Sequence, residues 1–432
     1  MQRVCSKPNI LLKRYTSIRP ITCYGLRYSS TTINKDDRHK VYALPFNLSE
    51  DTIRQSINFA SYANQHSFFA IFEIIKSLFT KKTPEVKKYV TNMQIRKVYL
   101  PFWYYDMAIS ADITPFLTKA GETDETIYQE IRPEQQILGI GFNCYWPGHT
   151  WDPVCYLSFR SCLTTCLTEL VPFTPNLCKG DIEVLPFSAN PLEDLSKHAS
   201  NALENLEIKS ALHKNNVIII RNAKVLFNAA YPIYLPAYIV QYTNDNQKEG
   251  METQRTVVIG AHNSKPILHY WDSNKTGVEQ WINNGSWMNL DLSAQTWNIN
   301  TETRSMIRQL VERFTKEAVG NFQTKKIDWT DDCIQAYPKY QHQNKAYLAQ
   351  LFKIWSERSM LQLLEQMGEN RMAVGLHPRV DKSNTAPRIR MVPVKELRQN
   401  ITNDVRHDLN KLEELEPAWY KQYMKKQNGG KL

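Results

Sequence analysis

The phrase EVLPFSANPLEDL, at Glu183–Leu195, repeats much of an earlier phrase, YALPFNLSEDTI, at Tyr42–Ile53. In both phrases Leu-Pro-Phe comes shortly before a helix start signal. Ser49 is followed by two acids, and Asn190 is followed by Pro at the first helical position and Glu at the third. Ser and Asn are favoured N-cap residues, and acids stabilise the first turn of a helix. We therefore predict that each phrase leads into a helix, and apolar spacing extends the second helix to Leu206.

A second phrase is also shared, and it has the composition of a strand. VYLPFWYYDMAISADI occupies Val98–Ile113, and IYLPAYIVQYTND occupies Ile233–Asp245. Both are rich in aromatic and β-branched residues, which favour strands. The second phrase predicts a hairpin with Thr256–Ala261, and the preceding Asn215–Ala230 predicts a further strand.

Together these phrases predict an α+β protein with two related helix-plus-antiparallel-sheet units, at residues 41–180 and 181–270. The shared landmarks recur at similar separation in the two units, which suggests internal duplication. The alternative is that Leu-Pro-aromatic is common enough to recur by chance.

The remainder of the chain has a different pattern. Residues 271–300 are predicted to be a Trp-rich covering loop, and residues 301–432 a helical C-terminal region with a basic tail. Apolar periodicity predicts helices at Ala346–Met367 and Lys395–Pro417. The basic stretch Arg379–Val394 is expected to be a linker between them.

The order of these phrases resembles that of a group of uncharacterised fungal mitochondrial proteins. It is more distantly similar to bacterial proteins with a PFWLFDA-like strand, a PF-led helix and an N-terminal zinc ribbon. The resemblance covers roughly residues 41–270 and implies a fold, but no activity. The zinc ribbon does not carry over, because this chain has no Cys-x-x-Cys pair in that position.

The formal charge of +10 is concentrated at the two ends of the chain. Residues 1–40 contain nine Lys or Arg and two acids, and the first acid is Asp36. A basic, hydroxyl-bearing, acid-poor N-terminus is typical of a mitochondrial transit peptide. We therefore predict a disordered transit peptide at residues 1–34 and a location in the mitochondrion, in the matrix. An ordinary basic tail is the alternative.

One apolar segment stands out among the predicted helices. SFFAIFEIIKSLF, at Ser67–Phe79, has apolar residues at helical spacing around a wide face. Its length of about 20 Å is too short to cross a bilayer. A core helix is the first interpretation, and a helix that lies on a membrane surface is the alternative. The candidate contacts for a partner or membrane in this segment are Phe68, Phe69, Phe72 and Phe79.

The basic C-terminal region supplies a second set of candidate partner contacts. They are Arg388 and Arg390 in the linker and Lys425 and Lys426 in the tail. These side chains could bind ribosomal RNA or an acidic protein. A solvated charged helix is the alternative interpretation. No specific nucleic-acid motif is present.

No recognised catalytic motif is present in the sequence. The sequence contains no Walker A loop, no dinucleotide-binding glycine fingerprint and no nucleophile elbow. The weak catalytic candidates are His149, Asp152 and Cys155 in YWPGHTWDPVCY, because a Cys–His pair can form an activated thiolate. Turn residues that cap or contact solvent are the alternative. We expect no cofactor and no metal, and buried thiols at the central cysteines.

Three functions therefore remain open from the sequence. The first is a non-enzymatic matrix interaction or assembly protein, associated with mitochondrial gene expression and with a protein partner or the mitochondrial ribosome. The second is a peripheral inner-membrane protein without a transmembrane segment. The third is an unrecognised enzyme that uses the His149–Cys155 turn.

Overall fold

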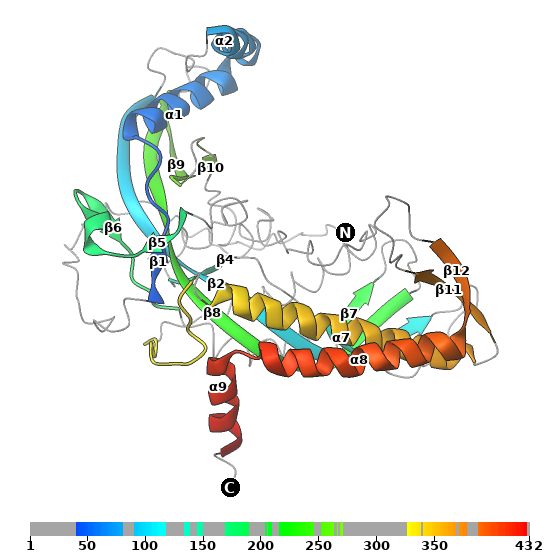
Figure 1. The fold of residues 1–432 in the computed structure, drawn as a ribbon. Helices are drawn as coiled ribbons and strands as arrows, with labels where there is room; N and C mark the ends of the chain where they lie inside the picture. The colour runs from blue at the N-terminus through cyan, green and yellow to red at the C-terminus, as the bar shows by residue number, and fades with distance from the viewer. Residues whose placement is uncertain are drawn as a thin grey trace, which may run out of the picture.

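The protein has an α+β architecture in which a mixed sheet is joined to C-terminal helices (Figure 1). The computed structural model describes residues 40–80, 90–117, 134–138, 145–149, 169–189, 204, 206–209, 216–245, 252–262, 266, 268–270, 326–337, 340–368, 371–377 and 388–429. The predicted transit peptide and the predicted Trp-rich loop lie outside these residues. So do the predicted helix start at Asn190 and the central cysteines from Cys144 to Cys166.

Two long antiparallel strands form the centre of the sheet. Strand β2 spans Val90–Leu117 and strand β8 spans Asn216–Asp245, and the two pair along nearly their whole length. The predicted strands Asn215–Ala230 and Ile233–Asp245 are therefore one continuous strand. Sequence pattern divides them at Tyr231-Pro232, but Pro232 still pairs opposite Trp103.

Shorter strands extend the sheet from these two. β3 (Glu134–Leu138), β4 (Tyr145–Pro147) and β6 (Ile182–Val184) pair with β2. β1 (Tyr42–Ala43), β7 (Leu206–Lys209) and β9 (Glu252–Gly260) pair with β8. β5 (Val171–Pro172) pairs with β1, and β10 (Leu268–Tyr270) pairs with β9.

The β8–β9 pairing confirms the predicted hairpin. The predicted helical stripe is wrong at its last residue, Leu206, and its earlier residues lie outside those described. Leu206 begins strand β7 and pairs with Ile220 of β8. Its apolar side chain suits a sheet as well as a helix, and the adjacent Ile218–Ile220 segment provides the partner strand.

Two helices follow the first phrase. Helix α1 spans Glu50–Gln65, and the predicted N-cap is confirmed because Ser49 Oγ accepts from Thr52 N at 3.3 Å. Helix α2 spans Ser67–Thr80 and packs against α1. The α1–α2 pair lies at one end of the sheet (Figure 1).

The C-terminal region contains three described helices and a two-stranded ribbon. Helices α7 (Gln341–Met367) and α8 (Val394–Leu415) confirm the predicted pair and lie side by side (Figure 1). The prediction of a linker is wrong for Arg388–Pro393, which forms strand β12 and pairs with β11 (Met372–His377). The basic tail is helix α9 (Ala418–Gly429), and its first turn packs on the core.

The two Leu-Pro-Phe phrases pair with the long strands in the same way. β1 runs parallel to β8, and Leu44 N donates to Tyr234 O at 3.1 Å. β6 runs parallel to β2, and Leu185 N donates to Tyr99 O at 3.1 Å. Because Leu100 pairs with Leu235 in the β2–β8 register, the two phrases occupy equivalent places on either side of this pair.

The equivalence continues into the turns that follow. Gly148 N donates to Pro101 O at 2.9 Å, and Ser188 N donates to Gly148 O at 2.8 Å. On the opposite side, Ala261 N donates to Pro236 O at 2.8 Å, and Asn47 N donates to Ala261 O at 2.7 Å.

Aromatic side chains follow the same pattern. The ring centroids of Phe46 and Tyr99 are 5.1 Å apart, and those of Phe187 and Tyr234 are 5.0 Å apart. Each phrase thus binds the long strand that the sequence assigns to the other unit, so residues 41–180 and 181–270 share one interlocked sheet. Descent of the two units by duplication stays a prediction.

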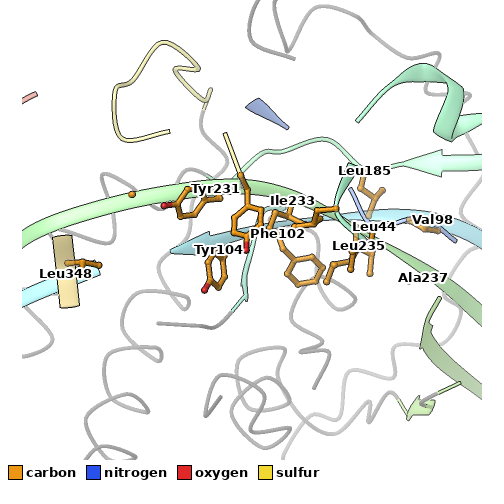
Figure 2. Packing of buried hydrophobic residues seen from close by; sticks show 14 of the residues in the cluster. Leu44, Val98, Phe102, Tyr104, Leu185, Tyr231, Ile233, Leu235, Ala237 and Leu348 are labelled. Carbon is orange, nitrogen blue, oxygen red and sulfur yellow. The ribbon is translucent and has the colours of Figure 1, made fainter. Parts of the chain in front are cut away.

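The hydrophobic core follows from this pairing (Figure 2). On one face, even-numbered residues of β2 such as Phe102 meet odd-numbered residues of β8 such as Ile233, together with Leu44 and Leu185. The other face is aromatic: Trp103 packs on Phe187, with ring centroids 5.0 Å apart. Strands that are buried on both faces have apolar side chains at successive positions, as β2 does from Val98 to Tyr105.

We predict that Leu44→Ala and Leu185→Ala destabilise the protein to a similar extent. Both side chains are buried in one cluster, so each truncation should lower the free energy of unfolding by roughly 2–5 kcal/mol. Denaturant titration measures this loss. Leu226→Ala is the matched control, since Leu226 lies on β8 with 36% of its surface exposed. A cost for either core variant as small as that of the control would contradict the prediction.

Candidate functional site

The weak catalytic candidate His149 lies in the turn after β4. Its Nδ1 is 2.9 Å from Pro186 O and 2.8 Å from Ser188 Oγ. Because a carbonyl only accepts, Nδ1 carries the proton and Ser188 Oγ is a second acceptor. Burial lowers the pKa of His149, which keeps the ring neutral. The other two candidates, Asp152 and Cys155, lie outside the described residues.

A close backbone approach positions this turn. A Cβ at Gly148 would lie 2.9 Å from Pro101 O and 2.9 Å from Phe187 Cδ1, so glycine fits where a larger residue would clash. His149 therefore anchors its turn to the second Leu-Pro-Phe phrase. His262 has the equivalent place after Ala261, and Asn47 Nδ2 donates to its carbonyl at 2.7 Å. Among the described contacts, those of His149 and His262 serve the packing of the sheet.

The structure contains a buried polar chain that sequence reasoning missed. Asp106, on β2, is 3% exposed and accepts from Tyr231 Oη at 2.7 Å. Asn344 Nδ2, on α7, donates to Tyr231 Oη at 2.7 Å, and Trp419 Nε1, on α9, donates to Asn344 Oδ1 at 3.0 Å. We call these four residues the Asp106 chain. In each of these hydrogen bonds the donor is the residue farther from Asp106, so the bonds run from α9 through α7 and β8 to the carboxyl group.

Burial determines the protonation of the Asp106 chain. Desolvation raises the pKa of Asp106 to about 6, and the Tyr231 hydrogen bond and the charge of Lys345 oppose this rise. Burial and the neighbouring Asp106 raise the pKa of Tyr231 well above its usual value, so Tyr231 remains a donor. The signal in the sequence was the single acid in the aromatic stretch FWYYDMA. This acid predicts a buried carboxyl group only once the strand is known to be covered on both faces.

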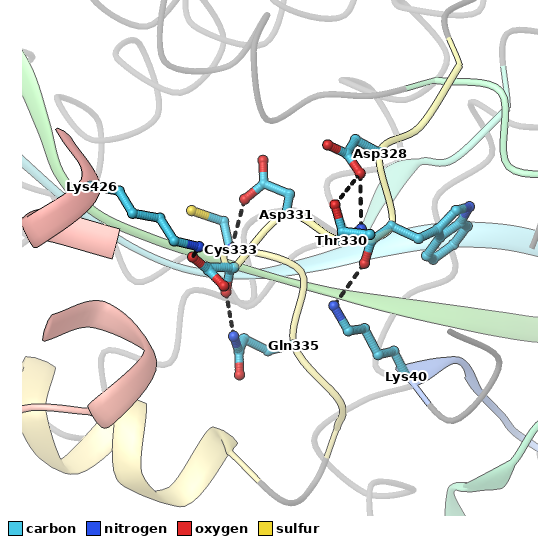
Figure 3. A network of polar contacts seen from close by, with 9 residues as sticks. Lys40, Asp328, Thr330, Asp331, Cys333, Gln335 and Lys426 are labelled. Carbon is cyan, nitrogen blue, oxygen red and sulfur yellow. Dashed lines mark hydrogen bonds and ion pairs between the residues drawn. The ribbon is translucent and has the colours of Figure 1, made fainter. Parts of the chain in front are cut away.

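The segment between the sheet and α7 is also held by polar contacts (Figure 3). Lys40 Nζ donates to Trp329 O at 2.7 Å, and Asp331 Oδ1 accepts from Cys333 N at 2.8 Å. Lys426, on α9, forms an ion pair with Asp332. This candidate partner contact is therefore engaged within the molecule.

The other basic candidates are placed in different ways. Lys425 is exposed on α9. Arg388 and Arg390 lie in β12, but their side chains are outside those described. Because α9 docks through Trp419 and Tyr420, with Tyr420 Oη donating to Leu226 O at 2.6 Å, the tail is a packed helix over its first turn.

The most exposed apolar surface described lies on α2. Five large side chains, Phe69, Ile71, Phe72, Ile74 and Ile75, are 43–60% exposed. Ala70, by contrast, is 3% exposed. The predicted core interpretation is therefore wrong for these five side chains, which the described fold leaves exposed although α2 packs against α1. The side chains of Phe68 and Phe79 lie outside those described.

The described residues include neither a metal-binding cluster nor a membrane-spanning helix. No group of three or more His, Cys, Asp or Glu among them could hold a metal ion. None of the helices in the described part of the chain is long and apolar enough to cross a membrane.

Comparison of the chain with family models, with curated proteins and with solved structures found no match. The resemblance to fungal mitochondrial proteins and their bacterial counterparts therefore stays a prediction.

We predict that His149→Asn weakens folding and changes its pH dependence. The loss of a hydrogen bond should cost about 1 kcal/mol at neutral pH. Folding lowers the pKa of His149, so the unfolded chain binds the proton at a higher pH than the folded chain does. The protein therefore loses stability as pH falls below 6.5. Denaturant titrations from pH 7.5 to 5 should show this loss in the wild type and a smaller one in the variant. Equal slopes would contradict the assignment, and exposed His407→Asn is the matched control.

We predict the opposite pH dependence for Asp106. Its pKa rises from 3.8 to about 6 on folding, so its contribution to stability is complete below about pH 4. That contribution is lost as pH rises to about 6, with a size on the order of 3 kcal/mol. Asp106→Asn stays neutral and still offers Tyr231 an acceptor, so the variant should lack this loss.

The measurement is the difference in unfolding free energy between wild type and variant across that pH range. Glu207→Gln on β7 is the control, because Glu207 is exposed. A wild-type minus Asp106→Asn difference that stays constant with pH would show that folding does not raise the pKa of Asp106.

Proposed function

We propose that this protein is a non-enzymatic interaction or assembly protein of the mitochondrial matrix, associated with mitochondrial gene expression, and that α2 is its docking element. The observation that carries the proposal is the exposed apolar surface of α2. Contiguous exposed apolar residues on a folded protein mark interaction sites. The basic, acid-poor N-terminus supports the location.

The fixed position of α2 supports a docking role. Helix α1 buries Ile53 and Ile57, each no more than 1% exposed, in a cluster with Tyr238 and Val257 of the sheet. Tyr62 O accepts from His66 N at 2.8 Å, and His66 O accepts from Ala70 N at 3.0 Å. The junction between the helices is therefore held by backbone hydrogen bonds, and the sheet presents α2 on a rigid base.

The energetic cost of the exposed surface also supports a partner. Full burial of an Ile or Phe side chain is worth about 1.5–3 kcal/mol, and each of these five is about half exposed. Covering all five would release on the order of 5 kcal/mol. The basic tail, which first suggested a partner, is the weaker candidate because Lys426 and the first turn of α9 have internal contacts.

We predict that Ile71→Ser, Ile74→Ser and Ile75→Ser together abolish docking without unfolding the protein. All three side chains are exposed, so the fold loses little. The fraction of tagged protein that co-sediments with large particles or membranes in mitochondrial lysate should fall by about tenfold or more. Rescue of a deletion strain should fall with it.

Met372→Ser with Met391→Ser is the matched control, because these exposed apolar residues lie on the β11–β12 ribbon. The control should sediment and rescue as the wild type does. If the α2 triple variant also does both, α2 is not the docking element and the proposal falls.

A further inference from the structure

We propose that the Asp106 chain is a pH-sensitive conformational switch: ionisation of Asp106 strengthens the docking of helix α9 on the sheet, and protonation weakens it. The switch is independent of the proposed docking role of α2, because α2 and α9 lie far apart in the molecule (Figure 1). Its basis is the direction of four linked groups and the small number of polar contacts that hold α9.

The chemistry of the side chains fixes the direction of the hydrogen bonds. The indole Nε1 of Trp419 can only donate, so the amide oxygen of Asn344 faces it, at 3.0 Å. The amide nitrogen of Asn344 then donates to Tyr231 Oη at 2.7 Å. The proton of Tyr231 Oη is therefore directed to Asp106 Oδ2, at 2.7 Å.

A chain with this direction favours a negative charge at its end. A carboxylate accepts a stronger hydrogen bond than a neutral carboxyl group does, and each linked donor is polarised in turn. Asp106 is 3% exposed, and Tyr231 and Asn344 are each 0% exposed, so solvent does not screen the effect. Ionisation of Asp106 should therefore strengthen the contact between Asn344 and Trp419, which belongs to α9.

The carboxyl group ionises in a range where its neighbours keep their charge. Burial raises the pKa of Asp106 to about 6, against the opposing effects of the Tyr231 hydrogen bond and the positive charge of Lys345 on α7. Burial, and then Asp106 itself, raises the pKa of Tyr337, in the segment before α7. Tyr231 of β8, which also interacts with Tyr104 of β2, has a pKa raised well above its usual value by burial. These phenols with raised pKa values stay neutral while Asp106 ionises.

Few other polar contacts hold α9 in the described structure. Tyr420 Oη donates to Leu226 O at 2.6 Å, and Lys426 forms an ion pair with Asp332. The β2–β8 register passes over Leu226, so the Tyr420 hydroxyl satisfies a carbonyl at an irregular point of β8. Because the contacts are few, a change in the strength of the Trp419 hydrogen bond should change how often α9 detaches.

Detachment of α9 would uncover a defined surface. The ring centroid of Phe227, on β8, lies 5.3 Å from that of Trp419 and 5.0 Å from that of Tyr420. Both α9 rings would leave Phe227, and the Leu226 carbonyl would lose its donor. Acidification would thus expose an aromatic side chain and an open backbone acceptor on the same strand.

Thermodynamic linkage gives the sign of the effect. If ionised Asp106 strengthens the docking of α9, docked α9 must lower the pKa of Asp106 relative to the detached state. Detachment of α9 therefore becomes rarer as pH rises through about 6. Over the same range the contribution of Asp106 to global stability falls, because folding raises its pKa. Local detachment and global unfolding thus respond to pH in opposite directions.

Amide hydrogen exchange of the purified full-length chain tests the switch. The amides of Tyr420 and Lys421 each donate to Pro417 O at 3.0 Å, in the turn where α9 docks, so their exchange reports detachment. The readout is their exchange rate in the wild type divided by that in Asp106→Asn at the same pH, a ratio that cancels the intrinsic pH dependence of exchange. From about pH 5 to about pH 8, we expect this ratio to fall by roughly three- to eightfold.

Two further variants locate the coupling, each compared with the same variant that also carries Asp106→Asn. Trp419→Phe should remove most of the pH dependence, because phenylalanine has no N–H to donate to Asn344. Tyr420→Phe is the matched control, since it loses the hydrogen bond to Leu226 O and leaves the Asp106 chain complete. It should increase exchange at every pH and keep the fall of the ratio.

The proposal is overturned if the wild-type ratio is constant across this pH range. A ratio that rises with pH also overturns it, because detachment would then favour the charge by hydrating Asp106. Trp419→Phe with the full wild-type fall would exclude the route through α9. If Trp419→Phe detaches α9 at every pH, the wild-type ratio and the Tyr420→Phe control decide the outcome.

Discussion

The antiparallel pairing of β2 with β8, centred on Leu100 opposite Leu235, is the constraint on which the rest of the structure depends. Each of these two strands has an outer edge, and one Leu-Pro-Phe phrase pairs with each edge in parallel orientation. Because proline cannot donate to a ladder, the phrase leaves the sheet after its leucine. The following phenylalanine then packs on the aromatic face, so one short motif contributes to both faces of the core.

The crossed pairing makes the sheet a single cooperative body. Residues 41–48 bind β8, and residues 182–189 bind β2, so neither predicted unit can complete its sheet without the other. Parallel contacts between segments far apart in sequence require long loops to close before they stabilise anything. The equivalent hydrogen bonds at Leu44 and Leu185 show how two distant segments satisfy the same backbone groups in the same way.

Buried polar groups connect this sheet to the C-terminal helices. An acid as buried as Asp106 is costly unless it is hydrogen-bonded, and Tyr231 of β8 donates that bond. Asn344 of α7 and Trp419 of α9 continue the chain of hydrogen bonds from Tyr231. The geometry therefore favours one docking position for α9. At the opposite end of the sheet, α2 has apolar groups exposed to solvent. The described structure thus combines a C-terminal end that is held by internal contacts with an α1–α2 end that is suited to an external surface.

Local signals in the sequence determined the elements whose cause lies within a few residues. Ser49 caps α1 because its hydroxyl accepts from Thr52 N, three residues away, and apolar periodicity located α7 and α8. Only the tertiary structure decided that Arg388–Pro393 is a strand, that Asp106 is buried and that α2 faces outward. Each of those depends on what the rest of the chain places beside the segment: β11 pairs with Arg388–Pro393, the helices and sheet cover Asp106, and the described fold leaves the large apolar side chains of α2 exposed. Sequence spacing reports that a helix has an apolar face, whereas the position of its neighbours determines whether that face is covered.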